Sequence, residues 1–472
     1  MTTLLKNGTV IAWRDGRHEI IQNGTVAFDA DRIVDVGESF DGTADTTIDM
    51  AGRIVAPGFV NAHLHLTDTP FTKGYLEDNR GLVERTGAEY SANLYTTLPA
   101  VRNATDPDAQ LAGAKGALAE LLRCGSTTIV EMAYDEEILG GGDIAPVEAV
   151  ANAAGESGIR CYTGPRYRKY FYREQADGSI RYDHNPSDGR ERFEACKTFC
   201  RDFQGRFDDR LRTFLAPGQI DTCDPDLLKE TRAAADELGV LIQLHAGQSI
   251  QEYRLIRKTH GMTSIEYMDT TGLLGPNFII GHGQWLTETG DADDLGAAES
   301  EALAASGASI AHLPWCKVRR GGVINSIEKY RARGFKQCLG TDTFPYDMFN
   351  EMRIAAVTCK VVEQSGSVAF APFLYEMATT GGADALGRPD LGRLEAGAKA
   401  DIISVRIDTP KATPVYDPFR FLVYTATGED VDDVFIDGNQ VVKGGNVLTM
   451  DVAAVVDELN AAAARVRPRI AL

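Results

Sequence analysis

The chain has 472 residues, enough to bury a large core, and its 43% hydrophobic and 25% charged content is typical of a globular enzyme. This length favours one large domain with a smaller one beside it. The formal net charge of −20 argues against nucleic acid or an anionic membrane surface as a partner, because phosphate contacts need clustered lysine and arginine.

The first part of the chain predicts short β-strands. Residues 4–11, 32–37 and 47–50 are runs rich in apolar and β-branched residues. Asn-Gly pairs at 7–8 and 23–24 predict tight turns beside these strands.

A similar pattern returns near the other end, at residues 401–405 and 434–438. We therefore expect one small β-sandwich built from both chain ends, with 1–56 and 391–450 as its two parts. The alanine-rich segment that follows, 451–472, predicts a terminal helix.

Between these β segments, short apolar strands alternate with helix-like segments. Examples of the latter are 224–238, which has an aspartate in the N-cap position, and 300–306. Eight strands in such alternation over 57–390 predict an α/β fold, a (β/α)8 TIM barrel, in which catalytic groups lie at the C-terminal ends of the strands. The candidate strands end near His65, Glu131, Thr163, Ala216, His245, His282, His312 and Asp342.

The first of these strand ends carries two histidines one residue apart. His63 and His65 close an apolar run that begins at Phe59. Side chains at positions i and i+2 point to the same side of a strand, so both imidazoles can meet one divalent metal. A pair of this kind also arises by chance, and the metal interpretation therefore depends on the polar residues at the later strand ends.

Several segments, in chain order, carry a family resemblance. They are Pro-Gly-Phe-Val-Asn-Ala-His-Leu-His at 57–65, Gly-Leu-Leu-Gly-Pro at 272–276 leading to Gly-His-Gly at 281–283, Ala-His-Leu-Pro at 311–314, Gly-Thr-Asp at 340–342 and the segment 391–401. Together they resemble the metal-dependent amidohydrolase superfamily, and most closely its triazine hydrolase and cytosine/guanine deaminase-like branch. The resemblance covers nearly the whole chain and implies the barrel with its terminal sandwich.

The resemblance also implies a metal centre. Its ligands would be His63, His65, His245 and Asp342, with His282 beside the metal and its water. Binuclear members of the superfamily carry a carboxylated lysine at the end of strand four, whereas strand four here, 212–218, has no lysine. We therefore expect one divalent metal per chain, Zn or Fe(II).

The chemistry of such a centre is hydrolytic. Three neutral imidazoles and one carboxylate leave a position open for water, whose pKa the cation lowers. Hydroxide generated at the metal would attack an electrophilic carbon. Asp342 would take the water proton and later deliver it to the leaving group, and His282 would polarise the substrate or hold the nucleophile.

One position departs from the deaminase pattern. Deaminases of this branch carry a glutamate three residues after the strand-five histidine, and that position here is Gln248. An amide can bind substrate but cannot transfer a proton as a carboxylic acid does. Ammonia leaves poorly unless protonated, so Gln248 favours a leaving group that departs as a stable anion, such as chloride or nitrite. Glu131 is an alternative source of the acid.

The substrate pocket is expected in the loops after strands one, seven and eight, where aromatic side chains can stack on a flat ring. The candidate substrate-binding residues are Gln248, His312, Trp315, Phe71, Tyr75 and Tyr346, with Phe344 as a further aromatic candidate.

Two basic segments have a less specific interpretation. The basic-aromatic stretch 166–173 is expected to be a solvated loop or a subunit contact, in preference to a binding patch for an anionic ligand. The basic residues Lys317, Arg319 and Arg320 are likewise expected in a solvated loop, in preference to contact with an anionic or carbonyl group of a ligand.

The sequence thus predicts a metal-dependent hydrolase that displaces an amino, halide or nitro substituent from a small cyclic, heteroaromatic nitrogen compound. Two alternatives stay open: hydrolysis of a linear amide, urea or carbamate, and a non-catalytic metal-binding scaffold. The eight cysteines form no CxxC pair and the N-terminus lacks a charged leader, so we expect a cytoplasmic protein without a membrane segment. Its expected partners are a small-molecule substrate and further copies of the chain in a homo-oligomer, with no nucleic acid.

Overall fold

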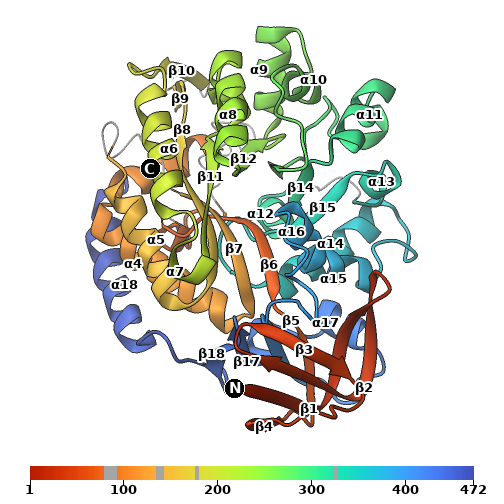
Figure 1. Ribbon diagram of the computed structural model, residues 1–472. Coiled ribbons are helices and arrows are strands. Elements are labelled where there is room, and N and C mark those ends of the chain that lie inside the picture. The colour runs from red at the N-terminus through yellow and green to blue at the C-terminus, as the bar shows by residue number, and fades with distance from the viewer. Residues whose placement is uncertain (68, 79–92, 134–142, 176–179, 323–326) are drawn as a thin grey trace.

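The structure is a computed structural model that describes residues 1–67, 69–78, 93–133, 143–175, 180–322 and 327–472 (Figure 1). Its central feature is a barrel of parallel strands. The barrel strands of the described residues are β6 (Phe59–Leu64), β7 (Ser126–Ala133), β8 (Arg160–Tyr167), β11 (Leu211–Pro217), β12 (Leu241–Ala246), β13 (Phe278–His282), β14 (Ser309–His312) and β15 (Lys336–Leu339). They follow one another around the barrel in chain order, from β6 to β15.

The barrel closes where the last strand meets the first. The Asp342 N–H donates to the His63 carbonyl at 3.0 Å, and the His65 N–H donates to the Asp342 carbonyl at 2.9 Å. One face of the strands fills the interior with side chains such as Val60 and Phe214, and the other face packs against the helices. The predicted (β/α)8 barrel is confirmed.

Helices surround this barrel (Figure 1). The described helices are α3 (Leu98–Ala104), α4 (Pro107–Arg123), α5 (Ala145–Ser157), α6 (Arg190–Phe203), α7 (Arg206–Asp209), α8 (Pro225–Leu238), α9 (Ile250–His260), α10 (Ser264–Thr270), α11 (Ala297–Ser306), α12 (Pro314–Val318), α13 (Ile327–Ala332), α14 (Met348–Val362), α15 (Ala371–Ala378), α16 (Thr380–Ala385), α17 (Pro418–Tyr424) and α18 (Val452–Val466).

Helix α8 shows how the sequence sets the helix ends. Asp224 caps its start by accepting a hydrogen bond from the Leu227 N–H at 2.9 Å, and a proline occupies the first turn. Gly239 ends the helix in the left-handed conformation, with φ of 65°. The helix predicted at 224–238 is confirmed.

Strands from both chain ends form a further, mixed sheet (Figure 1). They are β1 (Thr2–Arg14), β2 (Arg17–Asp29), β3 (Arg32–Gly37), β4 (Thr46–Asp49), β5 (Arg53–Pro57), β16 (Ile402–Arg406), β17 (Val431–Ile436), β18 (Asn439–Lys443) and β19 (Asn446–Val447). The two chain ends meet where β5 pairs antiparallel with β16. The sheet bends so that Phe28 of β2 contacts Phe435 of β17, with ring centroids 5.5 Å apart. A small sandwich built from both chain ends is confirmed.

The turns predicted at the two Asn-Gly pairs are wrong. Both pairs lie inside the long strands β1 and β2, where Asn7 and Asn23 have φ of 65° and 50°. Gly8 pairs with Gly24 across the two strands, and the register shifts on both sides of Gly8. The positive φ that suits Asn in a turn serves a β-bulge here. The turn between the strands falls at Asp15–Gly16 instead.

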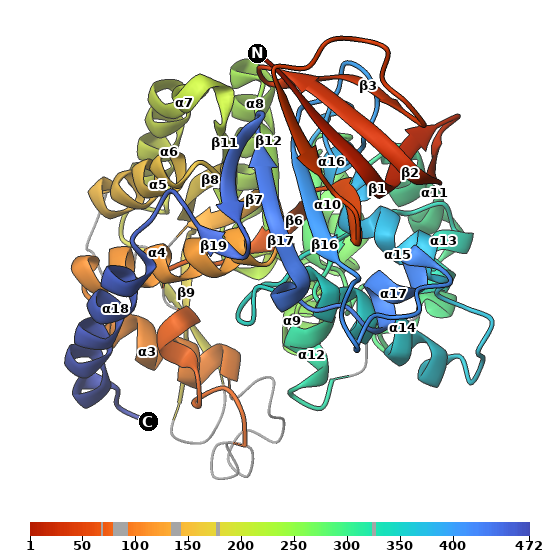
Figure 2. The ribbon, with the colours of Figure 1, turned by 90° about the horizontal axis from the view of Figure 1, so that it is seen from below.

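The terminal sheet covers the N-terminal end of the barrel (Figure 2). The Gly58 N–H, just before β6, donates to the Asp401 carbonyl at 3.0 Å. Arg160, the first residue of β8, is fully buried and contacts the carboxylates of Asp401 at 3.2 Å and Asp437 at 2.6 Å. The terminal sheet and the barrel therefore share a charged, buried contact.

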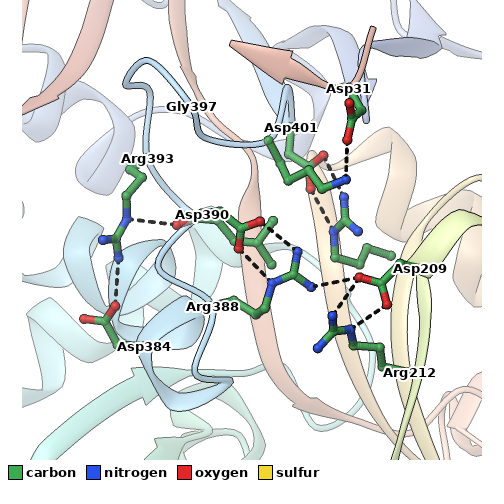
Figure 3. Close-up of polar contacts among 12 residues, drawn as sticks. Asp31, Asp209, Arg212, Asp384, Arg388, Asp390, Arg393, Gly397 and Asp401 are labelled. Atoms are coloured by element: carbon green, nitrogen blue, oxygen red, sulfur yellow. Dashed lines mark hydrogen bonds and ion pairs between the residues drawn. The ribbon is translucent and has the colours of Figure 1, made fainter. Parts of the chain in front are cut away.

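Ion pairs extend this contact (Figure 3). Arg388 lies 2.7 Å from Asp390 and 3.9 Å from Asp209, and Asp209 also binds Arg212 at 2.7 Å. Arg388 donates in addition to the hydroxyl of Tyr162, a barrel-interior residue, at 3.3 Å. Because this end of the barrel is covered, the opposite end is the place for a site.

Helix α18 packs along α4, where Lys115 pairs with Glu458 at 2.9 Å.

A separate antiparallel pair, β9 (Tyr170–Glu174) and β10 (Ile180–His184), follows β8. Within the described residues, no helix is both long and apolar enough to cross a membrane.

Candidate metal centre and active site

Five side chains converge at the C-terminal end of the barrel strands. His63 and His65 come from the end of β6, His245 from β12 and His282 from β13, and Asp342 follows β15. Ligand atoms of His63, His245, His282 and Asp342 all lie within 4.8 Å of one another. The Nε2 atom of His65 lies 3.2 Å from Nε2 of His245 and 3.5 Å from Oδ1 of Asp342. All five side chains are buried.

Three of these imidazoles are anchored through their Nδ1 atoms. The acceptors are Gln243 Oε1 for His63 at 2.9 Å, the Met132 carbonyl for His65 at 2.9 Å and the Gly218 carbonyl for His245 at 2.6 Å. Because carbonyl oxygens only accept hydrogen bonds, Nδ1 carries the hydrogen in each ring. Each Nε2 therefore presents its lone pair to the centre.

The arrangement fits a divalent metal. Within the described part of the chain, Nε2 of His63 and both ring nitrogens of His282 are buried without a hydrogen-bond partner. The lone pairs of His65 and His245 face each other at 3.2 Å, a contact that a cation between them stabilises. Tetrahedral coordination with bonds of about 2.0 Å places ligand atoms about 3.3 Å apart. The Nε2 atom of His65 lies 3.2 Å from Nε2 of His245 and 3.5 Å from Oδ1 of Asp342. The Nε2 atom of His63 lies 3.6 Å from the same Oδ1.

Burial and neighbouring groups set the charge states. Burial, followed by the field of His63, lowers the pKa of His245 well below its usual range, and burial followed by the charge of Lys317 does the same for the pKa of His282. Burial alone would raise the pKa of Asp342, but its interaction with His63 and the other imidazoles holds it well below its usual range. The neutral imidazoles of His245 and His282 and the ionised carboxylate of Asp342 are the kinds of donor that a zinc-type ion prefers.

Strand β6 is irregular where it delivers the two histidines. Val60 and Ala62 belong to the barrel interior, so strict alternation would turn His63 outward. The pairing of β6 with β7 shifts its register after Asn61. As a result, the rings of His63 and His65 face the same centre, with centroids 5.1 Å apart.

The segment after β15 brings Asp342 against β6. A Cβ at Gly340 would lie 2.6–2.7 Å from the His63 backbone, so only glycine permits this approach. The Asn61 side chain links the two strands, accepting from the Thr341 N–H at 3.0 Å and donating to its Oγ1 at 2.9 Å. Asp342 adopts φ of 61°, a rare value for a non-glycine residue that costs about 1–3 kcal/mol. The surrounding bonds hold the carboxylate in place against this strain.

A pocket lies beside the metal cluster. His65, His245 and Asp342 form part of its wall, and Gln248 and Tyr172 lie there as well. Of the predicted substrate-binding residues that the structure describes, Gln248 alone lines this pocket.

The aromatic residues after strands one and eight are placed elsewhere. Phe71 packs among residues of α3, α4 and α18, and Tyr75 lies with it in a separate depression beside α18. Tyr346 is fully buried, and its hydroxyl donates to the His65 carbonyl at 2.6 Å. Tyr346 thus supports the loop that carries the second histidine.

The residues after strand seven also lie outside the described pocket lining. Nε2 of His312 bonds to Gln337 Oε1 at 2.8 Å, and its ring stacks on Tyr330 with centroids 5.7 Å apart. Alternation along β14 turns His312 away from the barrel interior, which its neighbour Ala311 fills. Trp315 is partly buried, and its backbone N–H donates to Oε2 of the buried Glu351 at 2.9 Å.

Gln248 is fixed through its backbone. Its N–H donates to Glu252 Oε2 at 3.2 Å and its carbonyl accepts from Lys317 Nζ at 2.7 Å. Burial raises the pKa of Glu252 to about 8 and lowers the pKa of Lys317 to about 8. Glu131, the alternative acid, accepts from the Leu66 N–H at 2.9 Å, and alternation along β7 turns it away from the barrel interior.

The expectation of solvated basic loops is wrong for several residues. Arg166 and Arg168 of the basic-aromatic stretch are buried, because β8 carries the chain to the mouth of the barrel before it turns into β9. Lys317 and Arg320 are buried too. The sequence holds a signal for Arg166, which lies just past the predicted end of the third barrel strand, where side chains face the site.

Residues 54–441 match the Amidohydrolase family. The chain belongs to that family. This amidohydrolase is 32% identical over 444 residues to the 5-methylthioadenosine/S-adenosylhomocysteine deaminase of Halobacterium salinarum, covering 93% of each chain. It is 30% identical over 449 residues to the 5'-deoxyadenosine deaminase of Methanothermobacter thermautotrophicus, covering 94% of this chain and 95% of the relative.

Solved structures share the fold of this amidohydrolase. An adenosine deaminase from Xanthomonas campestris with bound zinc superposes with a TM-score of 0.81 at 23% identity, covering 99% of this chain and 98% of the other. Atrazine chlorohydrolase TrzN from Arthrobacter aurescens TC1, complexed with zinc, superposes with a TM-score of 0.80 at 23% identity, covering 98% of this chain and 100% of the other. The predicted membership of the amidohydrolase superfamily and the prediction of a hydrolytic enzyme are confirmed.

Proposed function

We propose that this amidohydrolase is a mononuclear metal enzyme that uses water to displace a substituent from a small nitrogen heterocycle. The observation that carries the proposal is the set of three anchored imidazoles whose Nε2 atoms meet Asp342 at the barrel mouth. The relatives at 30% identity or more are named deaminases of 5-methylthioadenosine, S-adenosylhomocysteine and 5'-deoxyadenosine, which supports a nitrogen heterocycle as substrate.

We infer one metal ion, held by His63, His65, His245 and Asp342. Strand β11 contains no lysine that could bridge a second ion, and the Gly218 carbonyl after it accepts from His245. His282 lacks the Nδ1 anchor that metal-binding histidines nearly always have, so we place it beside the metal. Zinc suits a nitrogen-rich tetrahedral set of this kind.

A divalent metal held there would supply a water of lowered pKa, and hence a nucleophile near neutral pH. The ionised carboxylate of Asp342 would accept a proton from the attacking water. His282, which is neutral and faces the centre, would hydrogen-bond the substituent on the ring carbon that the water attacks. The Gln248 amide hydrogen-bonds the substrate ring and transfers no proton.

Gln248 favours a leaving group that departs as a stable anion, such as chloride or nitrite. Deamination is a second candidate, which the names of the relatives favour. In that case Asp342 would deliver the proton that ammonia needs to leave.

A paired assay tests the proposal. One ring scaffold carries an amino, chloro or nitro group, and the released ion is measured for the wild type, for Gln248→Glu and for the control Gln22→Glu. Gln22 is exposed on β2 in the terminal sheet and offers the same chemical change far from the site.

We expect chloride or nitrite to leave faster than ammonia in the wild type. Gln248→Glu should raise ammonia release relative to chloride release by about tenfold or more, since general acids contribute about 10²–10⁴-fold. Efficient wild-type release of ammonia, with a ratio that Gln248→Glu leaves unchanged, would contradict the role given to Gln248.

Fe(II) as the native metal, a cytoplasmic location and a homo-oligomer stay predictions. The set of candidate ligands is complete, which argues against a non-catalytic scaffold. A linear amide, urea or carbamate belongs in the same substrate panel as the heterocycles.

A further inference from the structure

A buried glutamate behind the pocket holds two of the residues that line it. Glu252 on α9 is fully buried and is not among the described residues of the pocket wall. Its Oε2 accepts from the Gln248 N–H at 3.2 Å and from Gln219 Nε2 at 3.1 Å. Both glutamines lie in the wall of the pocket together with His245. One carboxyl group therefore connects the two amide-bearing residues of the described pocket lining.

The sequence places Glu252 where a glutamate normally caps its own helix. Ser249 is the N-cap residue of α9, and its hydroxyl accepts from the Glu252 N–H at 3.2 Å. In a Ser-x-x-Glu capping box the glutamate bonds back to the N–H of the N-cap residue. Glu252 reaches further back, because its Oε1 accepts from the Gly247 N–H at 2.5 Å and its Oε2 from the Gln248 N–H. Its contacts thus hold the loop that joins His245 to the helix.

The same loop is held from other sides as well. The Gly247 carbonyl accepts from the N–H groups of Gln284 at 3.0 Å and Trp285 at 2.8 Å, which both follow β13. The Gln248 carbonyl accepts from Lys317 Nζ at 2.7 Å. Because the backbone is bound on both sides of Gln248, the position of this residue in the pocket wall is determined by the loop.

Gln219 reaches the pocket wall from the neighbouring strand. Strand β11 pairs with β12, and Gln219 lies just after β11, next to Gly218, whose carbonyl anchors His245. Gln219 is buried, and its side chain is bound to Glu252. An amide carries both a donor and an acceptor, and so matches neighbouring acceptor and donor atoms on the edge of a heterocycle.

We propose that Gln219 and Gln248 together bind the polar edge of the substrate ring, and that Glu252 is the positioning residue that holds both. This inference rests on the proposed function for the ring and the reaction. It adds the atoms that the pocket recognises, a hydrogen-bond donor and an acceptor side by side, as in a ring nitrogen beside an amino group. Leu94 and Leu98 line the same pocket and supply apolar contacts for the ring. A ring that lacks the donor would leave a buried amide oxygen without its partner.

Binding of two small rings tests this directly. 2-Aminopyrimidine and 2-methylpyrimidine are neutral near pH 7 and have nearly the same shape, but the first alone carries a donor beside its ring nitrogen. Calorimetric titration of metal-depleted protein gives the dissociation constant of each, so that neither turnover nor coordination of the ring by a metal contributes. We expect 2-aminopyrimidine to bind about 5- to 100-fold more tightly, the range for a buried polar group that gains a partner.

Substitutions assign this preference to the three residues. Gln219→Leu and Gln248→Leu should each reduce it by at least about threefold, and Glu252→Gln should reduce it too, because an amide accepts through only one of its two arms. Glu266→Gln is the matched control, since Glu266 accepts from the Thr263 N–H at 2.7 Å at the exposed start of α10, and it should leave the preference unchanged. If Glu252→Gln does not fold, Glu252→Asp replaces it, because its shorter side chain should also reduce the preference.

A cycle of variants separates positioning from general stabilisation. If Glu252 acts through the two glutamines, Glu252→Gln should weaken 2-aminopyrimidine binding in the wild type but by less than about 1.5-fold in a protein that already carries Gln219→Leu and Gln248→Leu. Zinc affinity of Glu252→Gln should stay within about twofold of the wild type, because the Gly218 carbonyl, not Glu252, anchors His245. A merely structural role would give the same loss of ring binding in both backgrounds.

Equal affinity of the wild type for the two rings would overturn the inference. So would a preference that Gln219→Leu leaves intact, or an equal effect of Glu252→Gln in both backgrounds. Turnover of heterocycles without any preference for a donor beside a ring nitrogen would defeat this inference and leave the proposed function intact. A preference for 2-aminopyrimidine that depends on both glutamines, in a protein that hydrolyses no heterocycle when loaded with zinc, would do the reverse.

Discussion

Replacing Gln243 with leucine should weaken metal binding through His63. Gln243 is fully buried on β12, where its Oε1 accepts from His63 Nδ1 at 2.9 Å and its Nε2 donates to the Ala62 carbonyl at 2.8 Å. Leucine has a similar size and makes neither bond. The imidazole of His63 would then lose the contact that fixes its tautomer and its orientation.

Two costs follow from these contacts. Loss of the hydrogen bond to a metal-binding histidine lowers metal affinity by about 10- to 100-fold. The Nδ1–H of His63 and the carbonyl of Ala62 are also left buried without their present partners, at about 1–3 kcal/mol each. The free energy of unfolding of the metal-free protein should therefore fall by about 2–6 kcal/mol.

The chain offers a matched control for this experiment. Gln337 makes the same pair of bonds away from the metal cluster, since its Oε1 bonds to His312 Nε2 at 2.8 Å and its Nε2 donates to the Ile327 carbonyl at 3.0 Å. Gln337→Leu should lower the free energy of unfolding by a similar amount and leave zinc affinity within about twofold of the wild type.

Zinc affinity is measured by competition with a chelator, and stability by urea unfolding of the metal-free proteins. A loss of zinc affinity in Gln243→Leu but not in Gln337→Leu would support His63 as a ligand. Equal zinc affinities in both variants and the wild type would refute the reasoning.

Three further predictions address the carboxylate, the terminal sheet and acid stability. Asp342→Asn should lower kcat by about 100-fold or more, because the amide loses the base but keeps an oxygen donor, and metal analysis should still find bound zinc. Arg160→Met should lower the free energy of unfolding by about 3–5 kcal/mol, because it leaves the buried Asp401 carboxylate unpaired, and zinc affinity should not change. Burial, followed by the charge of Arg393, lowers the pKa of His18 in the folded protein to about 3. In the unfolded chain the pKa of this imidazole is about 6.5, so as the pH falls below that value the unfolded chain binds a proton that the folded protein does not. Between these pH values the wild type should lose up to about 1.4 kcal/mol of unfolding free energy per pH unit, and His18→Gln should show a shallower slope in urea unfolding.

The barrel and its metal centre could be predicted because local patterns determine them. An apolar run that stops at a polar residue marks the end of a barrel strand, and such ends gather on one face. His245 and Asp342 are far apart in sequence but follow this rule, and the structure brings both to the same centre.

Other features depend on register, which the sequence does not determine locally. His282 and His312 both end predicted strands, yet one faces the metal centre and the other packs beside Tyr330. A shift of one residue exchanges the two faces of a strand, and a shift of this kind in β6 is what turns His63 inward. The burial of Arg166 could not be predicted for a similar reason. The point at which β8 ends determines whether the Arg166 side chain reaches the pocket, and the sequence does not mark that point.

The most direct test of the mononuclear centre is a zinc titration of metal-depleted protein while turnover of a chloro- or amino-substituted heterocycle is followed. One equivalent of zinc per chain should restore full activity, and His245→Ala should bind little zinc and stay inactive, because it removes an anchored ligand. A requirement for two equivalents, or turnover that persists after the metal is removed, would contradict a single catalytic metal at this site.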